Sequence, residues 1–151
     1  VQRAPELKVT ALFDPNIDNQ GESQIFKEDG LREVLEHYNA LYGKDFTIPR
    51  HAAFKRDVAD RLAHKGAYRD LDRADDAVER RVDLLIVVDQ MLTGFDSKWI
   101  NTLYLDKVLR YEGLIQAFSR TNRLCGPEKP FGTIKYYRYP HTMRQNIPPL
   151  Q

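Results

Sequence analysis

Two arginines and a glutamine share one face of a predicted helix in the last third of the chain. Gln116, Arg120 and Arg123 stand in the stretch "LIQAFSRTNR" at positions i, i+4 and i+7. At about 100° per residue, this spacing aligns their side chains in one narrow stripe. Guanidinium groups match phosphate oxygens and stay charged at any relevant pH, so the stripe could grip a γ-phosphate. A solvated face or structural ion pairs would explain the same pattern, and periodicity alone favours that simpler interpretation.

A second polar segment follows the most apolar run of the chain. The run "DLLIVV" indicates a strand buried on both faces, and Thr93, Gly94 and Asp96 come soon after it. Ligands of parallel α/β sheets gather at the carboxyl ends of strands. Gly94 would let the backbone approach a ligand closely, Thr93 suits a phosphate, and Asp96 suits ribose hydroxyls or an arginine. A turn followed by a helix cap explains these residues equally well.

The elements that must position these residues alternate between strands and helices. Runs of β-branched and apolar residues predict strands, and apolar residues at helical spacing predict helices. The alternation indicates an α/β fold with a mostly parallel sheet flanked by helices. The expected strands are 7–13, 83–88, 102–106 and 132–139, the expected helices are 31–42, 52–64 and a solvent-facing helix within 68–82, and 14–30 is expected to be a loop and 140–151 a tail.

Other residues of a complete nucleotide site are missing from the sequence. No G-x-x-x-x-G-K-[ST] phosphate loop occurs, since Gly43-Lys44 is followed by Asp45, and no Asp-Glu pair follows an apolar strand to hold Mg²⁺. The four histidines are scattered, so we expect no metal site and no catalytic triad. The chain therefore carries arginines for a nucleotide without residues for its β-phosphate and metal, which amounts to half of a site.

Composition places the chain among water-soluble globular proteins. Its 151 residues are 42% apolar and 30% charged, with a formal net charge of +1, so any nucleic-acid surface must be local. The single cysteine, Cys125, is expected to be an inert thiol in a reducing compartment. No apolar run approaches the roughly 20 residues of a membrane span, and no signal-peptide core is visible. These features lead us to expect a cytoplasmic protein. Because a predicted strand starts close to the first residue, we also expect an excised domain.

The two polar segments resemble motifs V and VI of the second RecA-like lobe of superfamily 2 helicases. "LLIVVDQMLTGFD" resembles motif V, and "LIQAFSRTNR" resembles motif VI in the form Q-x-x-[GS]-R-x-x-R, with Ser119 where many helicases have glycine. Together with the linking "NTLYLDKVLRYEG", they are similar, nearly without gaps, to the motor (restriction) subunit of type I restriction-modification enzymes. The resemblance is strong across residues 83–134 and looser upstream.

This resemblance implies a RecA-like three-layer α/β domain, with residues 1–151 forming an incomplete second helicase lobe. It implies an ATPase and translocase that moves double-stranded DNA and ends in endonucleolytic cleavage, as part of a type I site-specific deoxyribonuclease. The first RecA-like lobe, which would hold the Mg²⁺ of ATP, and the nuclease domain would precede Val1. Modification and specificity subunits would complete the assembly, and the isolated fragment would be inactive.

The resemblance also implies roles for single residues. Arg123 would be the arginine finger, Arg120 its partner on the γ-phosphate, and Gln116 would orient one of them or the attacking water. Gly94 and Asp96 would line the ATP side of the cleft between the lobes.

In the same segment Thr93 would contact DNA phosphate. One departure from the family is Glu112, which stands where the family often has histidine. The stretch before motif V also looks longer than usual, which leaves the structure of 65–82 open.

Two alternatives remain beside the motor lobe. One is a lobe of another superfamily 2 helicase or remodeller, which the match around residues 103–111 disfavours. The other is a non-catalytic RecA-like interaction module, which would not need Arg120 and Arg123 to face a nucleotide. Exposure of these arginines on one open face beside Gly94 and Asp96 would favour the motor lobe.

Overall fold

The structure divides into two compact units, each considered by itself below. The first unit spans Val1–Gln90 and the second Met91–Gln151. The structure is a computed structural model. It describes residues 7–13, 21–87, 97–105, 112–113, 115–116, 119 and 132–137.

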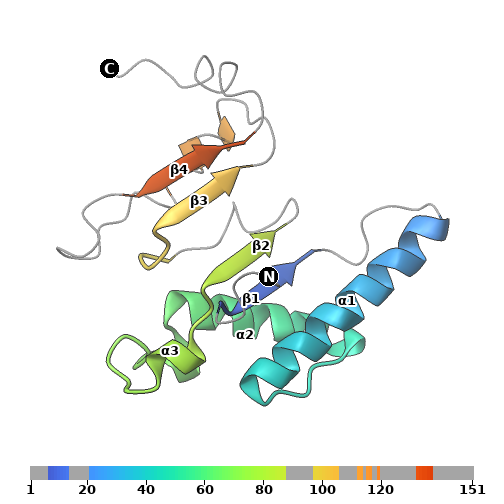
Figure 1. Ribbon diagram of the computed structural model, residues 1–151, viewed down its shortest axis with the longest axis horizontal. Coiled ribbons are helices and arrows are strands. Elements are labelled where there is room, and N and C mark those ends of the chain that lie inside the picture. The colour runs from blue at the N-terminus through green and yellow to red at the C-terminus, as the bar shows by residue number, and fades with distance from the viewer. Residues whose placement is uncertain are drawn as a thin grey trace. The chain divides into compact units, whose positions relative to one another are not determined.

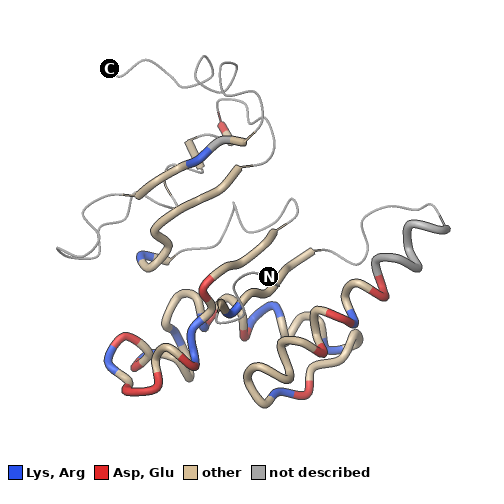
Figure 2. The backbone as a smooth tube through the Cα atoms, in the orientation of Figure 1, with Lys and Arg blue, Asp and Glu red and all other residues tan. Residues whose placement is uncertain are grey.

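The first unit contains a pair of parallel strands. Strand β1 spans Val9–Leu12 and β2 spans Leu84–Val87, with Val9 opposite Leu84 and Leu12 opposite Val87 (Figure 1). The parallel pairing agrees with the expected α/β fold, because parallel strands need a long crossover connection such as the helices between them. Charged residues lie along the helices and turns of this unit, whereas the two strands carry none (Figure 2).

Helix α1 spans Gly21–Tyr42 and packs on β1. Its buried face is formed by Leu31, Leu35 and Tyr38, which recur every three or four residues as predicted. The helix ends at Gly43, whose φ of 62° lies in the left-handed region that favours glycine.

The prediction of a loop over 14–30 is wrong for its second half, because residues 21–30 are helical. Residues 14–20 lie outside the described part of the chain. The stretch has no apolar periodicity, which is why a loop was expected, but Glu, Gln and Lys are good helix formers. Gly30 is tolerated inside the helix at a cost of about 1 kcal/mol.

Helix α2 spans His51–Ala63 and follows the short 3₁₀ helix η1 at Ile48–Arg50. Its buried residues are Phe54, Val58 and Arg61. In the sequence, Phe54, Val58 and Leu62 stand four residues apart, which predicts an apolar face, whereas the structure buries Arg61 beside Leu62. His64 closes the helix in the left-handed conformation at φ 52°.

The expected solvent-facing helix within 68–82 is also wrong. The chain forms a 3₁₀ turn at Gly66–Tyr68 (η2), further turns, and only the short helix α3 at Ala77–Arg80. Tyr68 and Leu71 are buried, whereas Val78 is exposed. Closely spaced aspartates favour turns over helix because their side chains compete for backbone hydrogen bonds.

Strand β2 is confirmed, but its burial on both faces is not. Leu84 is 38% exposed and Ile86 is 50% exposed, and both side chains lie on the same face of the strand. The apolar run indicated a wider sheet covered on both sides, whereas the described sheet of this unit consists of β1 and β2.

The second unit contains another parallel pair. Strand β3 spans Thr102–Leu105 and β4 spans Thr133–Tyr136, with Tyr104 opposite Lys135. Both strands were predicted. Among the described helices, none combines the length and the apolar composition that a bilayer-spanning segment needs.

Candidate functional site

Most residues of the predicted nucleotide site lie outside the described part of the chain. These are Thr93, Gly94, Asp96, Arg120 and Arg123. Whether the two arginines share an open face with Gly94 and Asp96 therefore stays a prediction. The structure does describe the strand that leads into each predicted segment, β2 before residues 88–96 and β3 before the predicted helix.

Gln116 is the one predicted site residue within the described part. It is helical, as are Glu112, Gly113, Ile115 and Ser119 around it, which agrees with the predicted helix. The Ser119 hydroxyl donates a hydrogen bond to the Gln116 carbonyl over 2.7 Å, a local bond typical of serine within helices. Ile115, the apolar residue next to Gln116, is 46% exposed.

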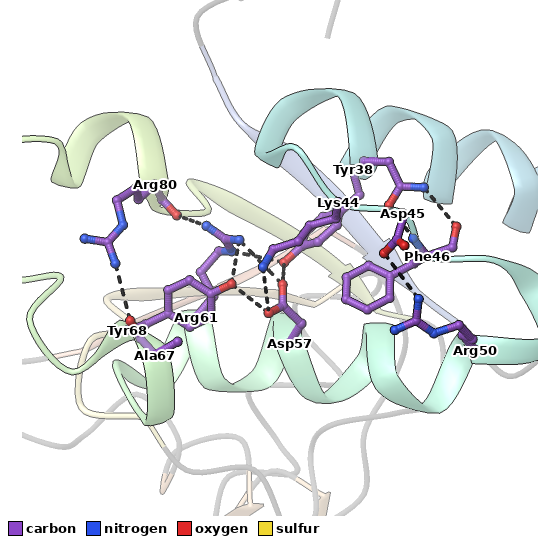
Figure 3. Close-up of polar contacts among 11 residues, drawn as sticks. Tyr38, Lys44, Asp45, Phe46, Arg50, Asp57, Arg61, Ala67, Tyr68 and Arg80 are labelled. Atoms are coloured by element: carbon purple, nitrogen blue, oxygen red, sulfur yellow. Dashed lines mark hydrogen bonds and ion pairs between the residues drawn. The ribbon is translucent and has the colours of Figure 1, made fainter.

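The best-defined polar arrangement is one that the sequence did not predict, and we call it the Arg61 cluster. Its centre is the guanidinium of Arg61, which is only 3% exposed (Figure 3). Three helical elements contribute to it, namely α1, α2 and η2. The cluster consists of Tyr38, Tyr42, Asp57, Arg61 and Tyr68.

Hydrogen bonds close the Arg61 cluster into a ring. Arg61 donates from Nε to the Tyr38 hydroxyl over 3.0 Å and from Nη2 to the Tyr68 hydroxyl over 2.8 Å. Each hydroxyl in turn donates to one oxygen of the Asp57 carboxylate, over 2.5 and 2.6 Å. Arg61 Nη2 also lies 3.5 Å from that carboxylate. The charged acid and base are thus bridged by two phenols, which satisfies buried polar groups that would otherwise be costly.

Aromatic rings surround the same guanidinium. The Arg61 Cζ atom lies 3.7 Å from the ring centroid of Tyr42 and 4.3 Å from that of Tyr68. The Tyr38 ring is farther, at 5.5 Å. Such cation–π contacts strengthen when water is excluded. The arrangement resembles an aromatic cage for a cation, but the cation is a side chain of the chain itself.

Burial determines the protonation of the tyrosines. It raises the pKa of Tyr42 to about 12, and this outweighs the opposing effect of the nearby Arg61 charge. Burial and hydrogen bonding to Asp57 raise the pKa of Tyr38 and of Tyr68 further above the ordinary value. The phenols therefore stay neutral and remain hydrogen-bond donors at physiological pH.

The Arg61 cluster also holds the backbone just before β2. Arg61 donates from Nη1 to the Arg80 carbonyl over 2.5 Å, and the Tyr42 hydroxyl donates to the Arg81 carbonyl over 2.7 Å. Two helices of the crossover thus bind the consecutive carbonyl groups at which α3 ends and the chain becomes extended.

The side chain of Arg80 binds the turns that precede this segment. Its Nη1 lies 3.3 Å from carboxylate oxygens of both Asp70 and Asp76, and its Nη2 donates to the Ala67 carbonyl. The hydrogen bond from Arg80 lowers the pKa of the Asp70 carboxyl.

The contacts of the Arg61 cluster indicate a structural role, which is to stabilise the fold of the first unit. Each guanidinium nitrogen of Arg61 donates to a protein acceptor, and the side chain is buried, so its contacts with the described residues are those of a structural arginine. Within the described residues, no three His, Cys, Asp or Glu side chains are grouped to hold a metal ion. The sequence did contain a signal for the cluster, because Asp57 and Arg61, and likewise Tyr38 and Tyr42, stand at i, i+4 spacing. The same spacing is typical of surface ion pairs and of apolar helix faces, so it did not indicate a buried cluster.

Comparison with known proteins identifies the class. Residues 1–139 match the profile of a family described as "Type I restriction enzyme subunit R domain 3". The chain is 38% identical over 127 residues to the type I restriction enzyme SauCOLORF180P endonuclease subunit of Staphylococcus aureus, covering 83% of this chain and 12% of that protein. It is 38% identical over 136 residues to the SsaAORF53P endonuclease subunit of Staphylococcus saprophyticus, covering 87% of this chain and 13% of that protein.

Another relative matches over a shorter stretch. The putative type I restriction enzyme MjaVIIP endonuclease subunit of Methanocaldococcus jannaschii is 51% identical over 51 residues, covering 34% of this chain and 5% of that protein. The chain belongs to the domain 3 family of type I restriction enzyme R subunits. It spans about an eighth of the length of the staphylococcal relatives that it matches.

Proposed function

We propose that this chain is the second RecA-like lobe of the ATP-driven DNA-translocation motor of a type I restriction enzyme. Membership in the R-subunit domain 3 family is the observation that carries the proposal. The two motif-like segments, each following a described parallel strand, support it. Such strand ends are where α/β sheets bind nucleotides.

In this proposal the lobe supplies charge to an ATP site that a first lobe of the same longer protein completes. Arg123 approaches the γ-phosphate as the arginine finger, and Arg120 binds the same group. Gln116 orients one of these arginines or the attacking water. The Mg²⁺ of ATP would be held by the first lobe and would supply positive charge against the phosphates.

The other motif contributes ligand contacts at the end of β2. Gly94 and Asp96 line the ATP side of the cleft between the lobes, and Thr93 contacts DNA phosphate. Contacts to phosphate carry no sequence information, so DNA binding by this lobe is salt-dependent and independent of sequence. The target sequence is read by a specificity subunit, and a modification subunit completes the assembly.

The decisive experiment replaces Arg123 by alanine in the complete R subunit and measures DNA-stimulated ATPase activity of the assembled enzyme. We expect the turnover number to fall about 10³- to 10⁵-fold, because arginine fingers contribute that much to phosphoryl transfer. Arg32→Ala is the matched control, since Arg32 forms an exposed pair with Asp29 on α1. The 151-residue chain alone should hydrolyse ATP negligibly.

Normal ATPase activity of Arg123→Ala would remove Arg123 from this role. Normal activity of Arg120→Ala as well would favour the non-catalytic interaction module. Saturable ATP hydrolysis by the isolated chain would contradict the division of the site between two lobes.

A further inference from the structure

We propose that one face of the β3–β4 pair is a stacking site for unpaired bases of single-stranded DNA. Tyr104 and Tyr137 form the aromatic surface, and Lys135 lies beside them. The stacking chemistry follows from the second unit by itself, whereas the choice of DNA over RNA rests on the proposed function. The residues of the proposed nucleotide site take no part in it.

Strand pairing brings the three side chains to one face. Tyr104 of β3 lies directly opposite Lys135 of β4 in the parallel ladder (Figure 1). Tyr137 stands two residues after Lys135, and its amide donates to the Leu105 carbonyl over 3.1 Å, so the pairing continues through it. Because side chains alternate between the two faces of a strand, Tyr104, Lys135 and Tyr137 project from the same side.

This face is exposed, and the opposite face is not. Tyr104 is 48% exposed, Tyr137 is 65% exposed, and Lys135 is exposed as well. On the other face, Leu105 is buried and Leu103 is half-buried. The strand pair therefore buries its leucines and displays two large rings, although the rings would gain more from burial.

The two exposed rings form one aromatic surface. Their centroids lie 5.9 Å apart, and their planes differ by 23°. The Lys135 Nζ atom lies 5.5 Å from the centroid of the Tyr104 ring. A nucleobase stacks on such a ring whatever its sequence, because every base has a π face, and a nearby lysine neutralises the phosphate that flanks the base.

The charge of these strands favours an anionic occupant. Among residues 97–105 and 132–137, the charged side chains are Lys98 and Lys135, and both are positive (Figure 2). An acidic peptide would supply charge without a planar group for the rings, whereas a nucleic acid supplies both. Bases within a duplex are already stacked on one another, so the occupant that fits is a single strand.

The experiment measures binding of a fluorescent oligothymidylate to the complete R subunit by anisotropy. Tyr104→Leu and Tyr137→Leu remove one ring each and keep an apolar side chain. Tyr137→Phe is the matched control, because it keeps the ring and loses the hydroxyl. We expect each leucine variant to raise the Kd about tenfold and Tyr137→Phe to change it less than about twofold, since the ring rather than the hydroxyl carries stacking.

The charge of Lys135 has a separate readout. Lys135→Gln should make the dependence of log Kd on log salt concentration shallower by about 0.7, the value for one phosphate contact on a single strand. Tyr137→Leu should leave this slope unchanged.

A cross-link locates the bound strand within the long R subunit. An oligothymidylate that carries iododeoxyuridine is irradiated with the unmodified protein, and the modified peptide is identified by mass spectrometry. We expect the cross-link at Tyr104 or Tyr137. This measurement needs no variant, so it decides the proposal even where a substitution impairs folding.

Three results would overturn the stacking site. They are unchanged affinity of both leucine variants, cross-links that avoid both tyrosines, and an equal loss for Tyr137→Phe and Tyr137→Leu, which would assign the effect to the hydroxyl. Tighter and equally tyrosine-dependent binding of oligouridylate would overturn the choice of DNA.

Failure of this inference and failure of the proposed function can be told apart. Tyrosine-independent oligothymidylate binding by an enzyme that Arg123→Ala inactivates overturns the stacking site alone. Tyrosine-dependent binding by an enzyme without DNA-stimulated ATPase activity overturns the proposed function and leaves the stacking site in place.

Discussion

The guanidinium of Arg61 and the carbonyl group of Arg80 are joined by a 2.5 Å hydrogen bond between α2 and the segment that leads into β2. Because Arg61 is also bound to Asp57 and to the Tyr38 and Tyr68 hydroxyls, this bond connects the helices of the crossover to the strand that they precede. The stability of the first unit should therefore depend strongly on Arg61.

Arg61→Met should destabilise the chain by about 3–5 kcal/mol, because it removes the buried cation beside the Asp57 carboxylate and leaves that carboxylate only the partly exposed Lys44 amine, 3.9 Å away. Urea unfolding of the chain at neutral pH measures the change. The exposed pair of Arg32 and Asp29 provides the control, and Arg32→Met should cost less than about 1 kcal/mol. Adding Asp57→Leu to Arg61→Met should recover part of the loss, since both charges are then absent. Equal losses for the two arginine variants would contradict a structural role for Arg61.

Stability should fall at alkaline pH because of the buried phenols. The folded chain holds their protons more tightly than the unfolded chain, in which the pKa of tyrosine is about 10. Their contribution is therefore complete below about pH 10 and is lost as the pH rises through the folded pKa, which is about 12 for Tyr42. We expect the urea midpoint to decline above about pH 10. Tyr38→Phe and Tyr68→Phe should each flatten the decline, and a midpoint of the unmodified chain that is level to pH 11 would refute the assignment.

The strands and the centres of the long helices could be predicted from the sequence, because their signals are local. The apolar run before Val87 and the periodic Leu31, Leu35 and Tyr38 needed no knowledge of the rest of the fold. The role of Arg61 could not be predicted in this way. An arginine is ordinarily exposed, and its burial depends on tyrosines from two other elements.

The structure of segment 65–82 also depends on partners that are distant in the sequence, and it could not be predicted for the same reason. Its charges suggested a solvated helix, but Arg80 binds Asp70 and Asp76, and Tyr68 turns inward to Asp57. These long-range partners, rather than helix propensity, determine the turns. The predicted nucleotide site depends on the sequence and on the family alone, since all its residues except Gln116 lie outside the described part of the chain.

Replacing a buried hydroxyl on β1 should raise the stability of the chain, in contrast to the substitutions in the Arg61 cluster. Thr10 is 5% exposed, and within the described part of the chain its Oγ1 atom has no hydrogen-bond partner. Valine has nearly the same shape without the polar atom, so Thr10→Val should stabilise the chain by about 1 kcal/mol. Urea unfolding measures the change. Thr47→Val, at an exposed position with extended backbone, is the control and should change stability by less than about 0.5 kcal/mol. A destabilised Thr10→Val variant would show that the hydroxyl is bonded after all.

Gly30 within α1 and Gly43 just after its end should respond to alanine in opposite directions. Gly30 lies inside the helix, and a Cβ atom there would be in ordinary contact, 4.0 Å from the Phe13 ring, so Gly30→Ala should stabilise the chain by about 0.5–1 kcal/mol. Gly43 has a φ of 62° with open space around it, so Gly43→Ala should cost about 1–2 kcal/mol through backbone strain alone. Thermal unfolding of the two variants and of the unmodified chain measures both effects. If residues 21–30 formed the loop that the sequence suggested, Gly30→Ala would bring no gain from helix propensity, and that result would contradict the helical start at Gly21.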